Sequence, residues 1–197
     1  YEKEFLICFI LLWVYLIMDI PIRFKIYLFW KNLFSKKDDS PHIKITKEGR
    51  GVRSVLFFLP EKKEDAKVIN YFVKIENPLS DYEIGLICSE KAKLFYPHVE
   101  NVSLFIYNDN DLNYFNTIKS VSLLNKIKIK NYDAIVDLNT NFCAASSMLF
   151  FDLDAPLKIG FDSLINRKIY TITLERKENA FLESYFSRIL SLLGVKF

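Results

Sequence analysis

Glycine is scarce in this sequence, with 5 residues among 197. None lies between Gly51 and Gly85, where the first strand–helix turn of the folded region is expected. Close binding of a pyrophosphate needs glycines that leave the backbone bare at a helix N-terminus. Since neither G-x-G-x-x-G nor G-x-x-x-x-G-K-[ST] is present, the sequence argues against dinucleotide binding and P-loop chemistry.

Cysteine and histidine are also sparse. The three cysteines, Cys8, Cys88 and Cys143, are far apart, and no Cys/Cys or Cys/His spacing predicts a zinc site or a disulfide framework. We expect them to be buried, reduced thiols. The two histidines lie near no nucleophile motif, and no G-x-S-x-G elbow is present. We therefore expect no metal and no cofactor.

The folded region lacks an excess of positive charge. Residues 1–50 carry a net charge of +3, whereas residues 51–197 are balanced at zero. A nucleic-acid-binding domain would carry a basic face of its own. We therefore expect no nucleic-acid partner, although local basic patches are compatible with this balance.

A long apolar run is present near the start of the chain. Phe5–Met18 contains fourteen apolar residues without interruption. As a helix, Phe5–Ile22 would be about 27 Å long, close to the roughly 30 Å of a bilayer core. We expect a short spanning helix or one that enters a single leaflet. A secretory signal fits poorly because the leading YEKE is not positive and no small-residue cleavage site follows. A buried helix of a soluble protein is the third alternative.

Basic and aromatic residues are mixed directly after this run, a composition that favours the headgroup zone of a membrane. The positive charge after Ile22 predicts that this side is cytoplasmic. We therefore predict a membrane anchor over residues 1–34, a polar linker over 35–51 and a soluble domain over 52–197 on the cytoplasmic side. The predicted membrane-interface residues are Arg23, Lys25, Tyr27, Trp30 and Lys31.

From residue 52 onward, apolar runs alternate with amphipathic segments. The predicted strands cover residues 53–60, 82–89, 101–108, 132–139, 157–162 and 168–175. The predicted helices lie in residues 64–76, 90–96, 111–130, 141–153 and 179–195. Pro97 halts the second, Asp111 caps the third and Gly194 ends the last. Alternation with near-continuous apolar strands predicts an α/β fold, a Rossmann-like and mostly parallel sheet with helices on both faces.

Polar residues follow the predicted strands, and ligands of such sheets bind beyond the carboxyl ends of the strands. Asp137 and Asn139 end the fourth predicted strand and are candidate ligand-binding residues. Polar side chains at a strand end often satisfy backbone groups instead. We favour that hydrogen-bonding role over a ligand role.

Two segments carry a resemblance to a known family. They are NYDAIVDLNTN…APLKIGFD, beginning at Asn131, and the closing ESYFSRILSLLGV. In this order they resemble the N-terminal half of family-9 glycosyltransferases, the lipopolysaccharide heptosyltransferases. The resemblance covers roughly residues 52–196. It implies a single half of a GT-B-type fold, with the half that binds the sugar nucleotide expected to begin where this chain stops, at Phe197.

The first turn departs from the family pattern. The family has a turn like R-L-G-A-L-G-D, whose aspartate is the proposed general base, and the matching stretch here is LPEKKED, Leu59–Asp65. Asp65 falls on the aspartate position, so the resemblance makes it the candidate catalytic residue. Glu61 and Glu64 replace the glycines, which implies an altered acceptor pocket. We favour a solvated carboxylate at the start of a helix, stabilised by the helix dipole, over a surviving catalytic role for Asp65.

These features lead to three functional hypotheses. The first is a membrane-anchored, non-catalytic accessory or structural subunit of a membrane complex, with membrane lipid and membrane-protein subunits as partners. The alternative is an enzyme component, the acceptor-binding half of a heptosyltransferase-like enzyme that works with a separate donor-binding half. Only this alternative brings in a sugar nucleotide. The third is a lipid- or glycan-binding module without chemistry.

Overall fold

The structure is a computed structural model of the 197-residue chain. It describes residues 24–27, 29, 52–73, 83–96, 102–163, 165–176 and 181–194. The chain divides into two compact units, Tyr1–Asp39 and Ser40–Phe197, which are considered separately below.

In the first unit, residues 24–27 and 29 are helical. The rings of Phe24 and Tyr27, one turn apart, have centroids 6.5 Å apart. The apolar run Phe5–Met18 lies outside the described residues, as do Arg23, Trp30 and Lys31. None of the helices in the described ranges combines the length and apolar composition that crossing a bilayer requires. The membrane anchor therefore stays a prediction.

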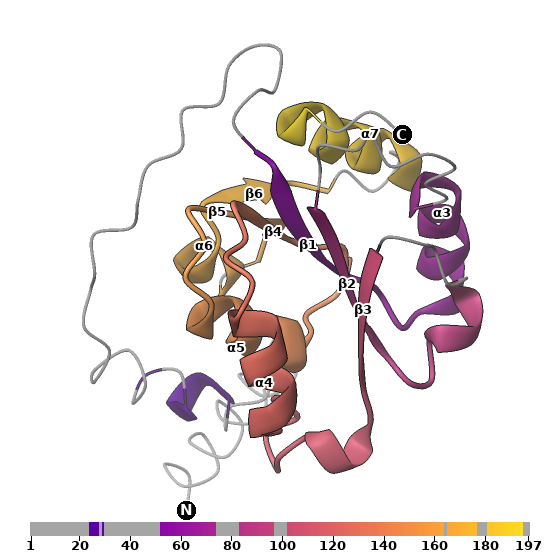
Figure 1. Ribbon diagram of the computed structural model, residues 1–197. Helices are drawn as coiled ribbons and strands as arrows, with labels where there is room; N and C mark the ends of the chain where they lie inside the picture. Colours follow the sequence, from indigo (N-terminus) through magenta and orange to yellow (C-terminus); the bar gives the residue numbers. More distant parts are fainter. Residues whose placement is uncertain are drawn as a thin grey trace, which may run out of the picture. The chain divides into compact units, whose positions relative to one another are not determined.

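The second unit is built on one six-stranded sheet (Figure 1). The order of strands is β3-β2-β1-β4-β5-β6, and every neighbouring pair is parallel. This confirms the predicted Rossmann-like parallel sheet, and the order is that of doubly wound nucleotide-binding folds. The bounds are β1 Ser54–Phe58, β2 Glu83–Ser89, β3 Val102–Tyr107, β4 Ala134–Asp137, β5 Leu157–Phe161 and β6 Ile172–Leu174.

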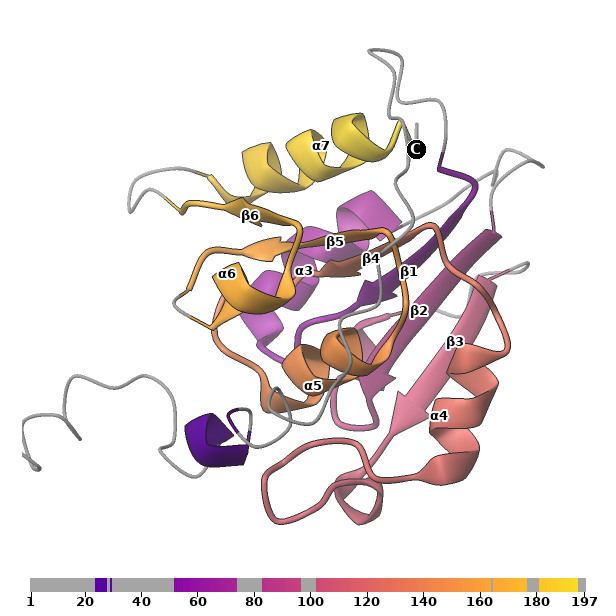
Figure 2. The same ribbon diagram turned by 90° about the vertical axis from the view of Figure 1, so that its left-hand side faces the viewer.

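Helices cover both faces of this sheet, as predicted (Figure 2). One face packs against α3 and α7, and the other packs against α4, α5 and the end of α6. The bounds of the α-helices are α3 Lys63–Val73, α4 Val121–Lys128, α5 Ala144–Asp152, α6 Asn166–Ile169 and α7 Leu182–Leu193. Two 3₁₀ turns are η1 Lys93–Phe95 and η2 Asp109–Asp111.

The central strand β1 shows why the strands read as continuous apolar runs. Val55 and Phe57 pack into the core under α3 and α7, whereas Leu56 and Phe58 pack into the core under α4 and α5. Successive side chains of a strand point to opposite faces. Because both faces are covered, every position of β1 is buried.

The predicted helix over residues 111–130 is wrong in its first half, since α4 begins only at Val121. Asn113 Oδ1 accepts hydrogen bonds from the backbone N–H groups of Phe115 and Thr117, at 2.9 and 3.1 Å. Asn116 adopts a left-handed conformation, with φ of 58°. An asparagine that bonds its own backbone competes with helix formation. Asp111 accordingly closes a capping box in η2 and does not cap α4.

Two shorter segments also differ from expectation. The short helix predicted before Pro97, over residues 90–96, is only a 3₁₀ turn, Lys93–Phe95. The predicted strand over 168–175 begins later, because residues up to Ile169 belong to α6. Asn166 fixes this turn: its N–H donates to Ser163 Oγ at 3.1 Å, and its Nδ2 donates to the carbonyl of Phe161 at 2.8 Å.

The closing helix α7 ends as predicted at Gly194. This glycine has φ of 68°, and its N–H donates to the carbonyls of Leu190 and Ser191. A left-handed residue that satisfies the last carbonyls is a common helix C-terminus, and glycine adopts this conformation without steric cost.

Candidate functional site

The candidate site lies where the order of strands reverses, between β1 and β4. The chain leaves β1 toward β2 on one side and leaves β4 toward β5 on the other. In doubly wound sheets, the crevice outside the carboxyl ends of these strands is the usual ligand site. Two segments meet there, the loop from β1 into α3 and residues 138–143 after β4.

Asp65 lies in the first turn of α3. Its exposed fraction is 6%, and its Oδ2 accepts a hydrogen bond of 2.6 Å from Thr140 Oγ1. The expectation of a solvated carboxylate is therefore wrong. The carboxylate does lie at a helix N-terminus, where the dipole favours a negative charge. The bond to Thr140 joins segments 75 residues apart across the switch point.

Asp137 ends β4 and is 2% exposed. Its Oδ1 accepts the backbone N–H and the side-chain amide of Asn139, at 3.0 and 2.7 Å. Its Oδ2 accepts the hydroxyls of Ser146 and Tyr170, both at 2.6 Å. Burial raises the pKa of Asp137, and the bonds from Ser146, Tyr170 and Asn139 act in the opposite direction. The carboxylate thus holds together β4, α5 and the end of α6.

Asn139 is half-buried, and its side-chain amide is used by Asp137. The pair forms a local turn at the strand end, which fits the favoured hydrogen-bonding role. The ligand role of Asp137 and Asn139 stays a prediction. Sequence reasoning missed three partners in this region, Thr140, Ser146 and Tyr170, because hydroxyl residues carry no distinguishing pattern of their own.

The loop between β1 and α3 is tethered by two tyrosines. Tyr96 donates its hydroxyl to the carbonyl of Pro60 at 2.8 Å, and Tyr107 donates to Glu61 Oε1 at 2.9 Å. Residues 61–64 are exposed, whereas Asp65 after them is buried. The loop is thus charged on its exposed side, and hydrogen bonds from two buried tyrosines hold Pro60 and Glu61 in place.

The described cysteines show no sign of reactivity. Cys88 is buried, as predicted, and Cys143, the residue before α5, is half-buried. Burial raises the pKa of each thiol to about 11. A thiol with such a pKa holds little of the nucleophilic thiolate near neutral pH. Within the described ranges, no group of three His, Cys, Asp or Glu residues is placed to hold a metal ion.

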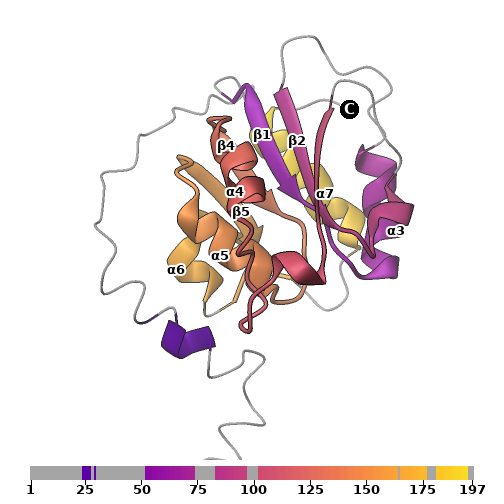
Figure 3. The same cartoon turned by 60° about the horizontal axis from the view of Figure 1, so that its bottom comes forward.

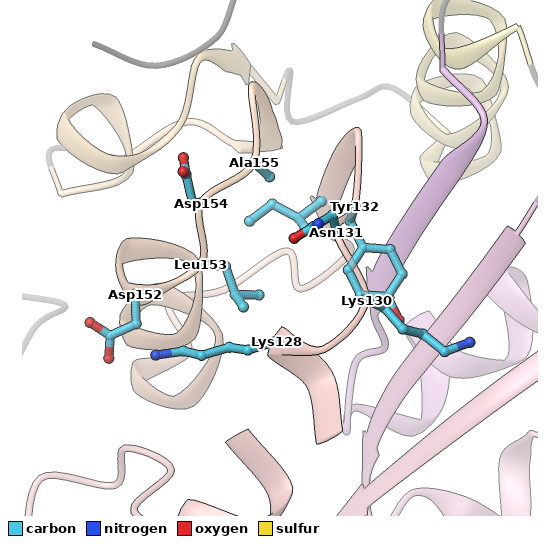
Figure 4. Close-up of a pocket in the computed structure, with 9 residues that line it drawn as sticks. Lys128, Lys130, Asn131, Tyr132, Asp152, Leu153, Asp154 and Ala155 are labelled. Carbon is cyan, nitrogen blue, oxygen red and sulfur yellow. The ribbon is translucent and has the colours of Figure 1, made fainter. Parts of the chain in front are cut away.

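A cavity of about 180 Å³ lies at the opposite, amino edge of the sheet (Figure 4). Its walls come from the end of α4 and the segment that enters β4, and from the end of α5 and the segment that enters β5. It is separate from the candidate site, since it contains neither Asp65 nor Asp137. The lining residues are Lys128, Lys130, Asn131, Tyr132, Ile135, Asp152, Leu153, Asp154 and Ala155.

Comparison with known proteins gives a likeness of fold. No protein-family model matches the chain, and no curated protein matches it. A family 9 glycosyl transferase from Veillonella parvula DSM 2008 superposes with a TM-score of 0.53 and 21% identity, over 74% of this chain and 42% of that chain. The E. coli heptosyltransferase WaaC, solved with ADP-2-deoxy-2-fluoro heptose, superposes with a TM-score of 0.55 and 15% identity, over 73% of this chain and 49% of that chain.

These matches confirm the predicted resemblance to family-9 glycosyltransferases at the level of the fold. The chain spans less than half the length of either solved structure. At such identities the likeness concerns the arrangement of strands and helices and carries no activity with it.

Proposed function

We propose that this chain is a membrane-anchored glycosyltransferase-like domain without catalytic activity, which serves as an accessory or structural subunit of a membrane protein complex. The observation that carries the proposal is the burial of Asp65 and its hydrogen bond to Thr140. In the resembling family the corresponding aspartate is the proposed general base. Here it is buried and already accepts a hydrogen bond from Thr140.

A general base must come within hydrogen-bond reach of the proton that it removes. The Thr140 hydroxyl occupies, at 2.6 Å from Oδ2, the kind of position that an acceptor hydroxyl of a sugar would need. An exposed fraction of 6% leaves little room for a second hydroxyl. The acceptor would have to displace Thr140 before transfer could begin.

The loop before Asp65 supports the same conclusion. Glu61 and Glu64 stand where the resembling family has glycines. Both are exposed, Glu61 in the loop and Glu64 in the first turn of α3. Glu61 is fixed by the hydroxyl of Tyr107. A carboxylate in place of a bare backbone adds bulk and negative charge where an acceptor would approach.

The membrane part of the proposal is based on the sequence. Phe5–Met18 is apolar throughout, and the basic and aromatic residues that follow suit a lipid headgroup region. We expect the anchor to hold the Rossmann-like domain at the cytoplasmic side of a membrane. Membrane-protein subunits are the expected partners.

A second function is favoured by the position of Asp65 at the switch point. In this second function, the chain would supply the acceptor-binding half of a heptosyltransferase-like enzyme. A separate donor-binding half would bind the sugar nucleotide. Within the described part of the chain, no hydrogen bond reaches Asp65 Oδ1, so one carboxylate oxygen is unused. Donor and acceptor would have to be held together for transfer to occur.

Mild detergent extraction of the full chain from its own membranes tests both functions. The accessory role predicts a stoichiometric membrane-protein partner without a nucleotide-binding half, and no consumption of sugar nucleotide by the complex. Co-purification of a donor-binding chain, with transfer that is lost in Asp65→Ala, would establish the alternative. Asp109→Ala, which changes an exposed carboxylate elsewhere, is the matched control.

A further inference from the structure

The segment that contains α4 differs in charge from the rest of the domain. Residues 112–131 include four lysines and no aspartate or glutamate, within a region of balanced charge. The helix lies on the face of the sheet that also carries α5 and α6 (Figure 3). Its inner side is conventional, since Leu123 and Ile127 are buried in the core one turn apart.

The outer side of α4 carries exposed aliphatic residues. Val121 is 68% exposed and Ile129, directly after the helix, is 80% exposed. At 3.6 residues per turn, Val121, Asn125 and Ile129 form one line along the outer face, and Lys126 and Lys128 lie on opposite sides of this line. Exposed aliphatic side chains between lysines are the pattern of a helix that lies in a membrane interface.

Three of the four lysines are free of salt bridges in the described part of the chain. Lys130 forms a salt bridge with Glu83. Lys119, Lys126 and Lys128 make no ion pair within the described part of the chain, and all three are exposed. Two carboxylates lie near one of them, since Asp152 and Asp154 line the cavity beside Lys128 (Figure 4).

We propose that this outer face of α4, hereafter the α4 surface, docks on an anionic membrane. Val121 and Ile129 enter the headgroup region, and Lys119, Lys126 and Lys128 contact lipid phosphates. The charge of the lysines complements an anionic bilayer. A nucleic acid would also attract them, but a phosphate backbone offers nothing to Val121 and Ile129, whereas acyl chains do. The proposal rests on the proposed membrane attachment only to bring the domain near the bilayer.

The contact is tested with the full chain in nanodiscs that contain brominated lipids, either neutral phosphatidylcholine or a mixture with phosphatidylglycerol. A fluorophore on Asn125→Cys, in a Cys8→Ser background, reports quenching by bromine at the α4 surface. A fluorophore on Ser187→Cys, an exposed position on the outer side of α7, is the reference. Co-elution of the chain with the nanodisc reports the anchor independently of the quenching.

The neutralised variant changes Lys119, Lys126 and Lys128 to glutamine. Each lysine near an anionic surface raises the affinity for the membrane about fivefold. The three lysines together should raise it on the order of 100-fold at moderate salt. The matched control, Lys67→Gln with Arg176→Gln and Arg188→Gln, removes the same charge from exposed positions elsewhere.

We expect quenching at position 125 in anionic nanodiscs, loss of quenching in the neutralised variant, and retention in the control. Equal quenching in neutral nanodiscs, or none in either while the chain co-elutes, would overturn the proposal. If the chain does not co-elute with the nanodisc, the predicted anchor is wrong. Quenching of the label at position 125 by brominated anionic vesicles then tests the α4 surface by itself. Oligonucleotide binding that the neutralised variant loses, without lipid quenching, would assign the α4 surface to nucleic acid and also overturn the proposal.

Discussion

Removal of one hydroxyl, by Tyr170→Phe, tests whether Asp137 holds the core together. Tyr170 donates to Asp137 Oδ2 at 2.6 Å, and both residues are buried. The ring itself stays in place, because it packs against Phe150 with centroids 5.5 Å apart and lies directly over Gly160. The substitution therefore deletes a hydrogen bond without creating a large cavity.

The magnitude follows from the charge of the acceptor. A hydrogen bond to a charged group contributes about 1.5–3 kcal/mol to the free energy of unfolding. For a chain of this size, a loss of that amount lowers the melting temperature by about 3–12 °C. Asp137 would keep three of its four donors, from Ser146 and Asn139, so we expect destabilisation and not unfolding.

The effect also has a predicted dependence on pH. Burial raises the pKa of folded Asp137 above that of the unfolded chain, about 3.9. The folded state therefore binds more protons, and the contribution of Asp137 to stability is greatest below the unfolded pKa and is lost as pH rises through the folded pKa. The bond from Tyr170 lowers the folded pKa. Removal of this bond raises the folded pKa further and so widens the gap between the folded and unfolded pKa values. The difference in free energy of unfolding between wild type and variant therefore grows as pH rises.

The assay is denaturant unfolding of both proteins in matched detergent between pH 4 and pH 8, with Tyr114→Phe, an exposed tyrosine, as the control. Less than about 0.5 kcal/mol of destabilisation at pH 7, within the range of ordinary surface substitutions, would refute the reasoning. A difference that shrinks with rising pH would contradict the assigned sign.

Other substitutions give expected losses that the same unfolding assay measures. Gly160→Ala would place its Cβ 2.2 Å from Tyr170 Cε2 and should cost about 1–3 kcal/mol by overpacking; wild-type stability would show that the ring can move freely. Gly194→Ala should cost about 1–2 kcal/mol because φ is 68°; an unchanged unfolding midpoint would mean that the end of α7 adopts another conformation without a left-handed residue. Asp65→Ala should cost about 1–3 kcal/mol because it leaves the Thr140 hydroxyl without its acceptor, whereas Asp65→Asn, which keeps an acceptor, should cost less; equal losses would argue against that bond.

The sheet could be predicted from the sequence because its signal is local. Strands such as β1 and β4 are covered on both faces, so they read as short apolar runs between polar turns. Both the parallel arrangement and the covering of both faces follow from the alternation with helices. Gly194 likewise marked the end of α7, because a helix end needs a left-handed residue.

Segment 111–120 could not be predicted by hydrophobic spacing. Its apolar residues recur at helical intervals, but Asn113 bonds the backbone of the following turn and Asn116 takes a left-handed conformation. Both effects are stronger than a weak helical propensity. The number of asparagines was the available signal, and it pointed to a turn.

The environment of the candidate site depended on distant contacts. The position of Asp65 came from the resemblance, but its burial depends on Thr140, 75 residues later. The four donors of Asp137 include Tyr170, 33 residues later. A strand-end aspartate in a sequence carries no sign of whether such hydroxyls or a ligand will occupy it.

The most direct test of the account is the consumption of sugar nucleotide by the full chain, extracted with its membrane partners and supplied with glycolipid acceptors. The account predicts no transfer above background, and the same value for wild type and Asp65→Asn. Transfer by the wild type that Asp65→Asn abolishes and Asp109→Asn preserves would show that this aspartate still acts as a base, and would contradict the account.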